Sequence, residues 1–409
     1  MIIQSHPTGN ANVRQTALAL CEAELMAEFW TCTSWNPDSL IARLLPSRLQ
    51  KQLARRTFAP QIRAKTHTFP WREMMRLAAP KLKLQAFTMH ETGFFSVDAV
   101  YRSLDERVAR RLEHLDGIRG VWAPEDGALE SFRAAKKRGI KCLYDLPIGY
   151  WKAGHQIFRE EIERQPQWAQ TLTGMADSAK KLARKDEEIR LADAIFVASS
   201  FTRETLRTFG DLTIPTFLVP YGAPAAMETA PISKSASEPL RILFVGSLSQ
   251  RKGLSYLLEA VEKLGKHAQL TLIGQKTGGE CVPLDAALAR HRYIPSLPHG
   301  EILHEMREHD VLVFPSLFEG FGLVIPEAMS QGLPVITTSH TGGPDIICDG
   351  EDGFIVPVRD ADAIFQRLES LLEPQLLLDM KIAAWKKAQQ LSWATYRNSQ
   401  ASAVKQVLA

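Results

Sequence analysis

The sequence predicts an α/β protein with two facing Rossmann-like domains, each built on a parallel sheet. Short β-branched apolar runs alternate with longer helical patterns along its 409 residues, which is typical of parallel α/β architecture. A chain of this length exceeds one ordinary core. A segment rich in Ala, Pro and Ser, residues 223–239, separates two similar halves and cannot form a core itself. We therefore expect a first domain at 1–222, a linker at 223–239 and a second domain at 240–390.

The apolar runs place the strands of both domains. In the first half we expect strands at 1–5, 28–33, 119–123, 141–144, 194–198 and 216–219, with helices at 128–138 and 180–191. In the second half we expect strands at 241–245, 269–273, 311–314, 335–338 and 354–356. Ligands of open parallel sheets bind beyond the carboxyl ends of the strands. Functional residues are therefore expected in the loops that follow these runs.

Composition excludes several classes of protein. The chain is 45% hydrophobic and 23% charged, as an average globular protein is. No run reaches the ~18 apolar residues of a spanning helix, and the N-terminus does not resemble a secretory signal. The five cysteines lie far apart without a CxxC pair, so neither a disulfide framework nor structural zinc is expected and a cytoplasmic location fits. The net charge of +3 says little by itself, and no nucleic-acid partner is expected.

Residues 314–332, FPSLFEGFGLVIPEAMSQG, have the most informative pattern. A buried strand leads into a loop with Glu319, and Pro326 is expected at the first position of a short helix. Glycines in the loop let backbone amides approach a ligand closely. The carboxylates of Glu319 and Glu327 can each accept two hydroxyls of a sugar or ribose. The alternative is a solvated loop glutamate followed by a helix with an acidic first turn.

This segment resembles the E-x7-E signature of family 4 glycosyltransferases, which are retaining enzymes of the GT-B fold. The resemblance covers most of the second half and includes residues 244–253, 310–319, 332–336, 341–343 and 349–353. It implies that Glu319 holds donor sugar hydroxyls and that Glu327 takes the ribose hydroxyls. It also implies a donor site along the loop residues Gly320, Phe321, Gly322 and Leu323, with amides from Phe321 to Leu323 on sugar and phosphate. The C-terminal helix, 391–409, resembles the segment that returns to the first domain.

A basic pair follows the first strand of the second half. The strand ends at Gly246, and Arg251 and Lys252 precede a helical pattern at 254–264. A departing nucleoside diphosphate develops negative charge that fixed cations stabilise, Lys as a point charge and Arg as a fork. An exposed surface pair is the alternative. The family often has an arginine directly after the strand glycine, where this chain has Ser247, so Arg251 is expected to compensate.

The resemblance implies catalysis without a metal or other cofactor, the nucleotide-sugar being a substrate. The DxD string at Asp360 and Asp362 precedes a helical pattern, and we interpret it as a helix cap. The histidines form no HExxH motif or cluster.

The first half has weaker candidates for the acceptor side. Gly9 and Asn10 lie in a loop that resembles the glycine-bearing first loop of GT-B enzymes, which helps to hold donor diphosphate and acceptor, or else is a simple strand-to-helix turn. The resemblance makes Gly9 a candidate for donor binding and Asn10 a candidate on the acceptor side. The family frequently has a histidine at the end of a central strand, where this chain has Asp145. A carboxylate there could orient the acceptor hydroxyl or stabilise positive charge on the sugar. Asp145 is our first candidate, with Glu125 and Asp126 next, and the alternative is that Asp145 caps a turn.

Residues 40–85 concentrate positive charge. The segment contains eleven basic residues and one acid, Glu73, and apolar residues are interleaved with the basic ones. We expect this segment to bind an anionic membrane surface or an anionic acceptor, the alternative being a solvated helical face. The protein would then act in the cytoplasm, peripherally on the inner face of the cell membrane.

The sequence as a whole predicts a hexosyltransferase-type enzyme (EC 2.4) that moves a sugar from a nucleotide-sugar to a glycan or lipid-linked acceptor, in cell-surface polysaccharide or glycolipid assembly. One alternative is a GT-B sugar-nucleotide epimerase, which would convert the donor alone. Another is a catalytically silent binding subunit of a polysaccharide-assembly complex. The base, the sugar and the acceptor stay open.

Overall fold

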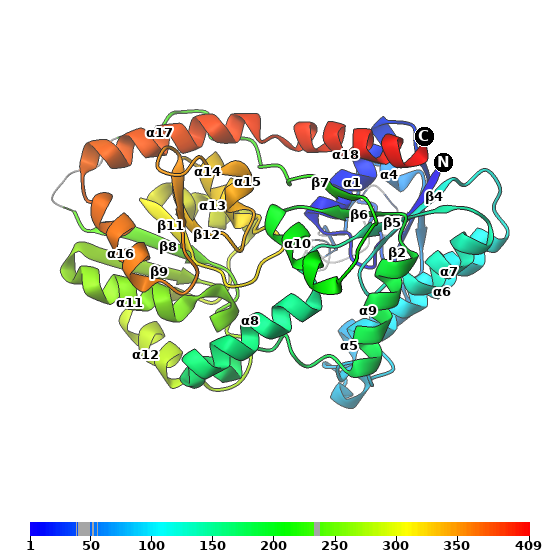
Figure 1. The fold of residues 1–409 in the computed structure, drawn as a ribbon, viewed down its shortest axis with the longest axis horizontal. Coiled ribbons are helices and arrows are strands. Elements are labelled where there is room, and N and C mark those ends of the chain that lie inside the picture. The colour runs from blue at the N-terminus through cyan, green and yellow to red at the C-terminus, as the bar shows by residue number, and fades with distance from the viewer. Residues whose placement is uncertain (38, 40–49, 51–52, 55, 233–237) are drawn as a thin grey trace.

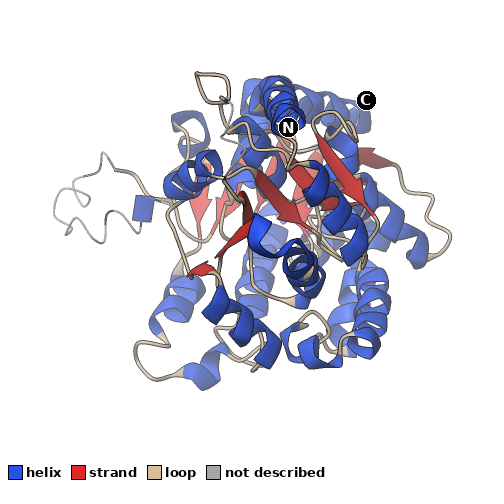
Figure 2. Ribbon diagram, turned by 90° about the vertical axis from the view of Figure 1, so that its left-hand side faces the viewer, coloured by secondary structure: helices blue, strands red, loops and turns tan. Residues whose placement is uncertain are grey.

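The computed structural model describes residues 1–37, 39, 50, 53–54, 56–232 and 238–409. Two parallel sheets form the centres of two domains that lie side by side along the long axis of the molecule (Figure 1). Helices cover both faces of the sheets (Figure 2). The predicted α/β architecture with two parallel sheets is confirmed.

The first sheet has seven strands within the described residues, in the order β3-β2-β1-β4-β5-β6-β7. Its strands are β1 (Ile2–Ser5), β2 (Met26–Thr31), β3 (Thr66–Thr68), β4 (Gly120–Pro124), β5 (Lys141–Asp145), β6 (Ala194–Val197) and β7 (Thr216–Leu218). The helices of this domain are α1 (Ala11–Glu22), α4 (Pro60–Arg63), α5 (Trp71–Ala78), η1 (Gln85–Thr88), α6 (Val97–Glu113), α7 (Leu129–Lys137), α8 (Trp151–Arg164), η2 (Pro166–Thr171), α9 (Ala179–Leu191), α10 (Ser200–Thr205) and η3 (Leu206–Phe209). The central strands are buried on both faces, as expected of a sheet between helical layers.

The second sheet has six strands in the described part of the chain, in the order β10-β9-β8-β11-β12-β13. Its strands are β8 (Leu240–Val245), β9 (Ala268–Ile273), β10 (Arg292–Ile294), β11 (Val311–Phe314), β12 (Val335–Thr338) and β13 (Gly353–Val356). The helices are η4 (Gln250–Lys252), α11 (Leu254–Leu264), η5 (Gly265–His267), α12 (Val282–Arg290), α13 (His299–Glu308), α14 (Val324–Ser330), α15 (Gly343–Ile346), α16 (Ala361–Ser370), α17 (Pro374–Gln390) and α18 (Trp393–Leu408). Asp360 caps α16 by accepting from the Ala363 amide at 2.8 Å, so its interpretation as a helix cap is confirmed.

Two short edge strands differ from the sequence prediction, which has no strand at β3 or β10. Each contains only three residues, and both lie at the outer edge of their sheets. The sequences THT and RYI lack a buried apolar run, because edge strands of this length need little core contact. Periodicity therefore could not reveal them.

The connections between the domains are packed against the second domain and the first helix. Met227, within the predicted linker at 223–239, is anchored to the second domain: its amide donates to the Ser330 carbonyl at 2.9 Å, and the Trp385 indole donates to the Met227 carbonyl at 2.9 Å. Helix α18 returns to α1, where the hydroxyls of Tyr396 and Thr16 lie 2.7 Å apart (Figure 1). Within the described residues, no helix has both the length and the apolar character needed to cross a bilayer.

Helix α8 bridges the two domains along one side (Figure 1). Its Glu161 is fully buried and accepts hydrogen bonds from three side chains of the second domain. The donors are Gln250 at 2.6 Å, Tyr256 at 3.0 Å and Arg359 at 2.8 Å. A buried carboxylate with several charged and neutral donors holds its partners in a defined geometry. The two domains are therefore fixed relative to each other on this side.

Candidate active site

The loop after β8 and the loop after β11 are in direct contact. Gly253 has φ +68°, and a Cβ at this position would lie 2.0 Å from the Pro315 carbonyl oxygen. A glycine is therefore required for both the left-handed backbone and the close approach. The contact is completed by the Leu317 amide, which donates to the Arg251 carbonyl at 2.8 Å. This arrangement brings the basic pair against the loop that contains Glu319.

Arg251 and Lys252 lie in η4, directly before α11. The Lys252 ammonium forms an ion pair with the carboxylate of Glu319, and an Arg251 nitrogen lies 3.5 Å from the same carboxylate. Burial lowers the pKa of Lys252, and the neighbouring Arg251 adds to this effect, whereas the contact with Glu319 opposes it. The structure thus brings together three of the residues that the sequence predicts for the donor site.

The backbone beside Glu319 is held against the first domain. A Cβ on Gly320 would lie 1.8 Å from the Pro147 carbonyl oxygen, and the hydroxyls of Ser199 and Thr202 donate to the Gly320 carbonyl at 2.6 and 3.0 Å. The N–H groups of residues 320–323 donate to no acceptor within the described residues. Four neighbouring amides without an internal partner can hold a polar or anionic ligand.

Glu327 lies in the first turn of α14. Its carboxylate is 3.0 Å from the Nε2 atom of His299, and burial raises the pKa of Glu327. A ribose would have to replace His299 at this carboxylate. The expected position of Pro326 is wrong: α14 begins at Val324, so Pro326 is its third residue. A proline is tolerated there because the first four N–H groups of a helix have no partner within the helix.

The loop after β1 folds back on itself through His6. The Nδ1 atom of His6 accepts from the amides of Thr8 and Gly9, both at 3.1 Å, and burial lowers the pKa of His6 to about 4. Gly9 has φ +61° and abuts the ring of Phe58. The Asn10 side chain accepts from the Val13 amide at 3.2 Å and caps α1. Asn10 therefore has a structural role in addition to its candidate role on the acceptor side.

Asp145 and Glu125 lie at the carboxyl ends of neighbouring strands of the first sheet. Asp145 ends β5, and the Glu125 amide donates to the Asp145 carbonyl at 3.0 Å. Burial raises the pKa of Asp145 to about 7, with a hydrogen bond from Trp122 opposing it. Burial also raises the pKa of Glu125 to about 7, opposed by Lys185 at 3.5 Å. Both carboxyls therefore titrate near neutral pH, as groups that exchange protons in catalysis do.

A cavity of about 610 Å³ lies between the domains. The first domain contributes Glu125, Trp151, His155 and Lys185 to its lining, and the second contributes Ser247, Ser249 and Arg251. Asp145 and Asp126 are not among the lining residues. The structure thus places Glu125 and Arg251 in the lining of the same cavity. Asp145 instead lies close to Tyr221 and Tyr396: burial raises the pKa of both tyrosines, and the charge of Asp145 raises it further.

Asp126 belongs to a charged network beside this cavity. It has φ +68°, and its carboxylate lies 3.6 Å from Lys181 and 3.7 Å from Lys185. The same two lysines contact Asp177 at 3.0 and 3.3 Å. These ion pairs give Asp126 a structural function in the first domain.

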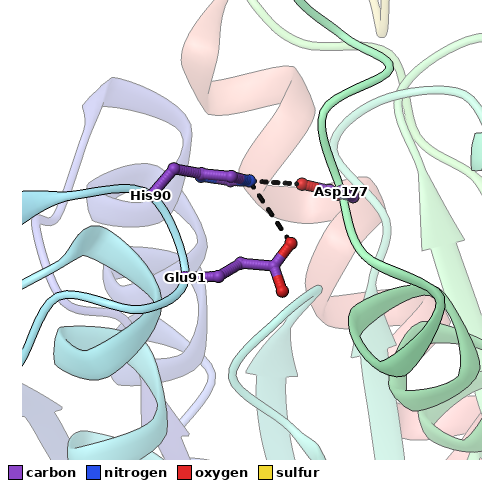
Figure 3. A group of neighbouring side chains, drawn as sticks. All are labelled: His90, Glu91 and Asp177. Atoms are coloured by element: carbon purple, nitrogen blue, oxygen red, sulfur yellow. Dashed lines mark hydrogen bonds and ion pairs between the residues drawn. The ribbon is translucent and has the colours of Figure 1, made fainter.

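His90, Glu91 and Asp177 meet at the edge of this network (Figure 3). The Nε2 atom of His90 is 3.0 Å from Asp177 and 3.4 Å from Glu91, and the three groups could hold a cation. Asp177 already has Lys181 and Lys185 as cationic partners, which disfavour a further positive ion. The sequence did not predict this group, because its members are far apart in the chain.

Other cavity residues were also missed by sequence reasoning. Trp151, His155 and Lys185 occur singly on α8 and α9 without a motif. His299 begins α13, and no spacing in the sequence links it to Glu327. The feature of the sequence that could have indicated Lys185 is the charge-rich pattern of α9, but such a pattern is more typical of a solvated helix face.

Comparisons with known proteins identify relatives of the second domain. Residues 227–390 match the family model of glycosyl transferases group 1. Over 142 residues the chain is 32% identical to the amylovoran biosynthesis glycosyltransferase AmsK of Erwinia amylovora, covering 31% of this chain and 34% of that protein. It is 31% identical over 153 residues to the phosphatidyl-myo-inositol mannosyltransferase of Mycobacterium leprae, covering 36% and 41%. The matches thus span between about a third and a half of the length of these relatives.

Solved structures resemble the whole chain. Sucrose-phosphate synthase from Thermosynechococcus elongatus superposes with a TM-score of 0.67 at 18% identity, covering 99% of this chain and 98% of that one. Anabaena Alr3699/HepE in complex with UDP-glucose has a TM-score of 0.64 at 16% identity, covering 99% of both chains. The chain therefore has the GT-B fold of these proteins, and its second domain is similar to the glycosyl transferases group 1.

Proposed function

We propose that this protein is a retaining, metal-independent family 4 glycosyltransferase. It would move a sugar from a nucleotide-sugar to a glycan or lipid-linked acceptor in cell-surface polysaccharide or glycolipid assembly. The single observation that carries the proposal is the contact of Arg251 and Lys252 with Glu319, beside four amides that lack an internal partner. Cations, a hydroxyl acceptor and free amides at one sheet edge match the parts of a nucleotide-sugar.

The ribose, the diphosphate and the sugar of the donor would each have a partner in this arrangement. The carboxylate of Glu327 would accept the ribose hydroxyls, replacing His299. The diphosphate would take Lys252 from Glu319, and Glu319 would then accept sugar hydroxyls. After this exchange Lys252 is paired with the diphosphate and Glu319 is hydrogen-bonded to hydroxyls, so neither charge is left buried without a partner. The amides of residues 320–323 would complete the contacts to sugar and phosphate.

Transfer requires that the bond between the anomeric carbon and the phosphate oxygen breaks. The new bond forms from the acceptor oxygen to the same face of that carbon, and the acceptor proton passes to the departing phosphate. Arg251 and Lys252 stabilise the charge that develops on the diphosphate, which in this mechanism replaces a divalent cation. Gly9 and Gly246 lie on the loops expected to approach the diphosphate.

The carboxylates of the first domain would act on the acceptor. Glu125 lines the interdomain cavity together with Arg251, which supports it as the group that orients the acceptor hydroxyl. Asp145, on the adjacent strand, stays a candidate for stabilising positive charge on the sugar. Trp151 offers an aromatic wall of the kind on which sugar rings pack.

The location of the protein also belongs to the proposal. We infer action in the cytoplasm at the inner face of the cell membrane, reached through the basic segment 40–85. Of that segment, residues 40–49, 51–52 and 55 lie outside the described residues. Arg56 is described, and it is paired with Glu73 at 3.0 Å.

A donor screen tests the proposal. Binding and slow hydrolysis are measured with UDP-, GDP- and ADP-sugars, starting with UDP-glucose because the similar HepE structure contains it. We expect one nucleotide series to bind, with release of free sugar of retained anomeric configuration and no loss of activity in EDTA. Conversion of the donor to an epimer would instead favour an epimerase. Binding without turnover, even with acceptor extracts, would favour a silent subunit, and a strict metal requirement would contradict the mechanism.

A further inference from the structure

Exposed apolar side chains concentrate in one segment of the first domain. Of the thirteen large apolar side chains that are exposed within the described residues, nine lie between residues 71 and 97, each at least 37% exposed. They are Trp71, Met74, Leu77, Leu82, Leu84, Phe87, Met89, Phe94 and Val97. We call residues 71–97 the apolar edge. Figure 1 shows α5 and the chain that follows it at the lower end of the first domain.

The most exposed charges of the apolar edge are positive, whereas its acid Glu91 is 20% exposed and lies 3.4 Å from His90. Lys81 and Lys83 are exposed between the apolar residues, and the Arg72 guanidinium lies over the rings of Trp71 and Phe94 at 4.8 and 4.4 Å. The acid Glu73 is buried and faces inward to its arginine partners. Apolar side chains and outward cations are thus combined on one surface.

We propose that the apolar edge is a membrane-binding surface that inserts its apolar side chains into the interface of an anionic bilayer. Large patches of exposed apolar residues mark interaction surfaces. Tryptophan and phenylalanine next to lysine and arginine fit the boundary between acyl chains and headgroups. Each cation gains about 1 kcal/mol, a roughly five-fold increase in affinity, near an anionic leaflet.

A second copy of the chain fits this surface less well. Symmetric pairing would place the same surface against itself, so Lys81 and Lys83 of one copy would approach the identical cations of the other. Like charges across an interface oppose association. An anionic lipid surface instead complements both the charges and the apolar residues.

The apolar edge also adjoins the interdomain cavity. His90 lies next to the exposed Met89, contacts Asp177 at 3.0 Å (Figure 3) and lines the cavity. A protein held through this edge would therefore have its cavity beside the bilayer. This inference rests on the membrane location in the proposed function and deepens it, but vesicle binding does not depend on the proposed transferase activity, so the two can be tested separately.

The test is co-sedimentation of the full chain with phosphatidylcholine vesicles that contain graded fractions of phosphatidylglycerol. We expect binding to increase with the anionic fraction and to decrease with salt. Leu82→Ser, Phe87→Ser and Met89→Ser should each weaken binding roughly ten-fold, because a large apolar side chain is no longer transferred out of water. The matched controls Ile232→Ser and Val282→Ser remove exposed apolar residues elsewhere, at 84% and 80% exposure, and should bind as the wild type does.

Charge and insertion are tested by further variants. Lys81→Gln with Lys83→Gln should weaken binding roughly 25-fold, whereas Lys137→Gln with Lys266→Gln should not. Brominated acyl chains should quench tryptophan emission in the wild type, and less so in Trp71→Phe. No vesicle binding at low salt, or equal loss in the control variants, would overturn the inference, as would self-association that Phe87→Ser abolishes. Donor binding should be unchanged in every edge variant, so a protein that binds vesicles but no nucleotide-sugar would refute only the proposed function.

Discussion

Replacing Lys252 tests the donor site most directly, because its partner Glu319 is also withdrawn from water. The side chains of Lys252 and Glu319 are 7% and 17% exposed. Removing one partner of a fully buried pair costs about 3–5 kcal/mol. Here the residual exposure of Glu319, and Arg251 at 3.5 Å, reduce that cost. We expect Lys252→Ala to lower the free energy of unfolding by about 2 kcal/mol, and Lys252→Ala with Glu319→Ala to restore most of it because the carboxylate that lost its lysine partner is then also removed.

The catalytic effect of the same change should be larger than its effect on binding. A fixed donor or cation that acts on transition-state charge contributes about 2.7–4 kcal/mol, so turnover should decrease by roughly 10²–10³-fold. The affinity for the nucleoside diphosphate should decrease by only about ten-fold, since Arg251 and the amides of residues 320–323 remain. The measurements are urea unfolding followed by circular dichroism, donor turnover and calorimetric titration of the nucleotide.

The control is Lys266→Ala, which removes an exposed lysine of the same domain and should change neither stability nor turnover. Equal losses in turnover and in nucleotide affinity would show that Lys252 only binds the donor. A double variant less stable than Lys252→Ala would refute the assignment of Glu319 as the partner whose charge is left unpaired.

Three further variants address the remaining groups. Glu327→Ala should weaken nucleotide binding at least roughly ten-fold, because each ribose hydroxyl loses a hydrogen bond to a charged group worth about 1.5–3 kcal/mol, and unchanged affinity by calorimetry would refute the ribose assignment. Because the pKa of Glu125 is raised to about 7, its carboxylate form increases above that pH. Turnover should therefore increase through about pH 7, and Glu125→Gln should lower turnover and reduce this increase in a pH–rate profile, any increase that remains being assigned to Asp145, whose pKa is also about 7. Asp145→Asn should lower turnover while its circular dichroism stays native, and full activity would mean that Asp145 is structural.

The fold could be predicted from the sequence because its strands are buried on both faces. A strand such as β11 is a continuous apolar run followed by a proline, and such runs are recognisable without knowledge of their neighbours. The donor loops were predictable for a related reason. Gly253 and Gly320 are demanded by backbone contacts with Pro315 and Pro147, so the local sequence itself records the approach of two loops.

The acceptor side could not be predicted to the same depth. Its cavity is formed by single residues of α8 and α9 and by the loop around His90, which meet only in the folded chain. Glu125 and Asp145 look equivalent in sequence, since each follows a strand. They differ in their surroundings: Glu125 lines the cavity, whereas Asp145 lies near Tyr221 and Tyr396. This difference depends on the packing of the domains.

The domain contacts explain how the two sides of the site can act together. The ring of Phe318, directly before Glu319, packs between Phe158 and Phe201 of the first domain. The carboxylate of Glu161 holds Gln250, directly before Arg251. The first domain thus braces both donor loops one residue away from their charged groups. Fixed dipoles and charges stabilise a transition state without reorganising, so in the proposed mechanism this bracing would preorganise the cations for the departing phosphate. A substitution of Glu161 should therefore affect turnover, although Glu161 itself would contact neither substrate.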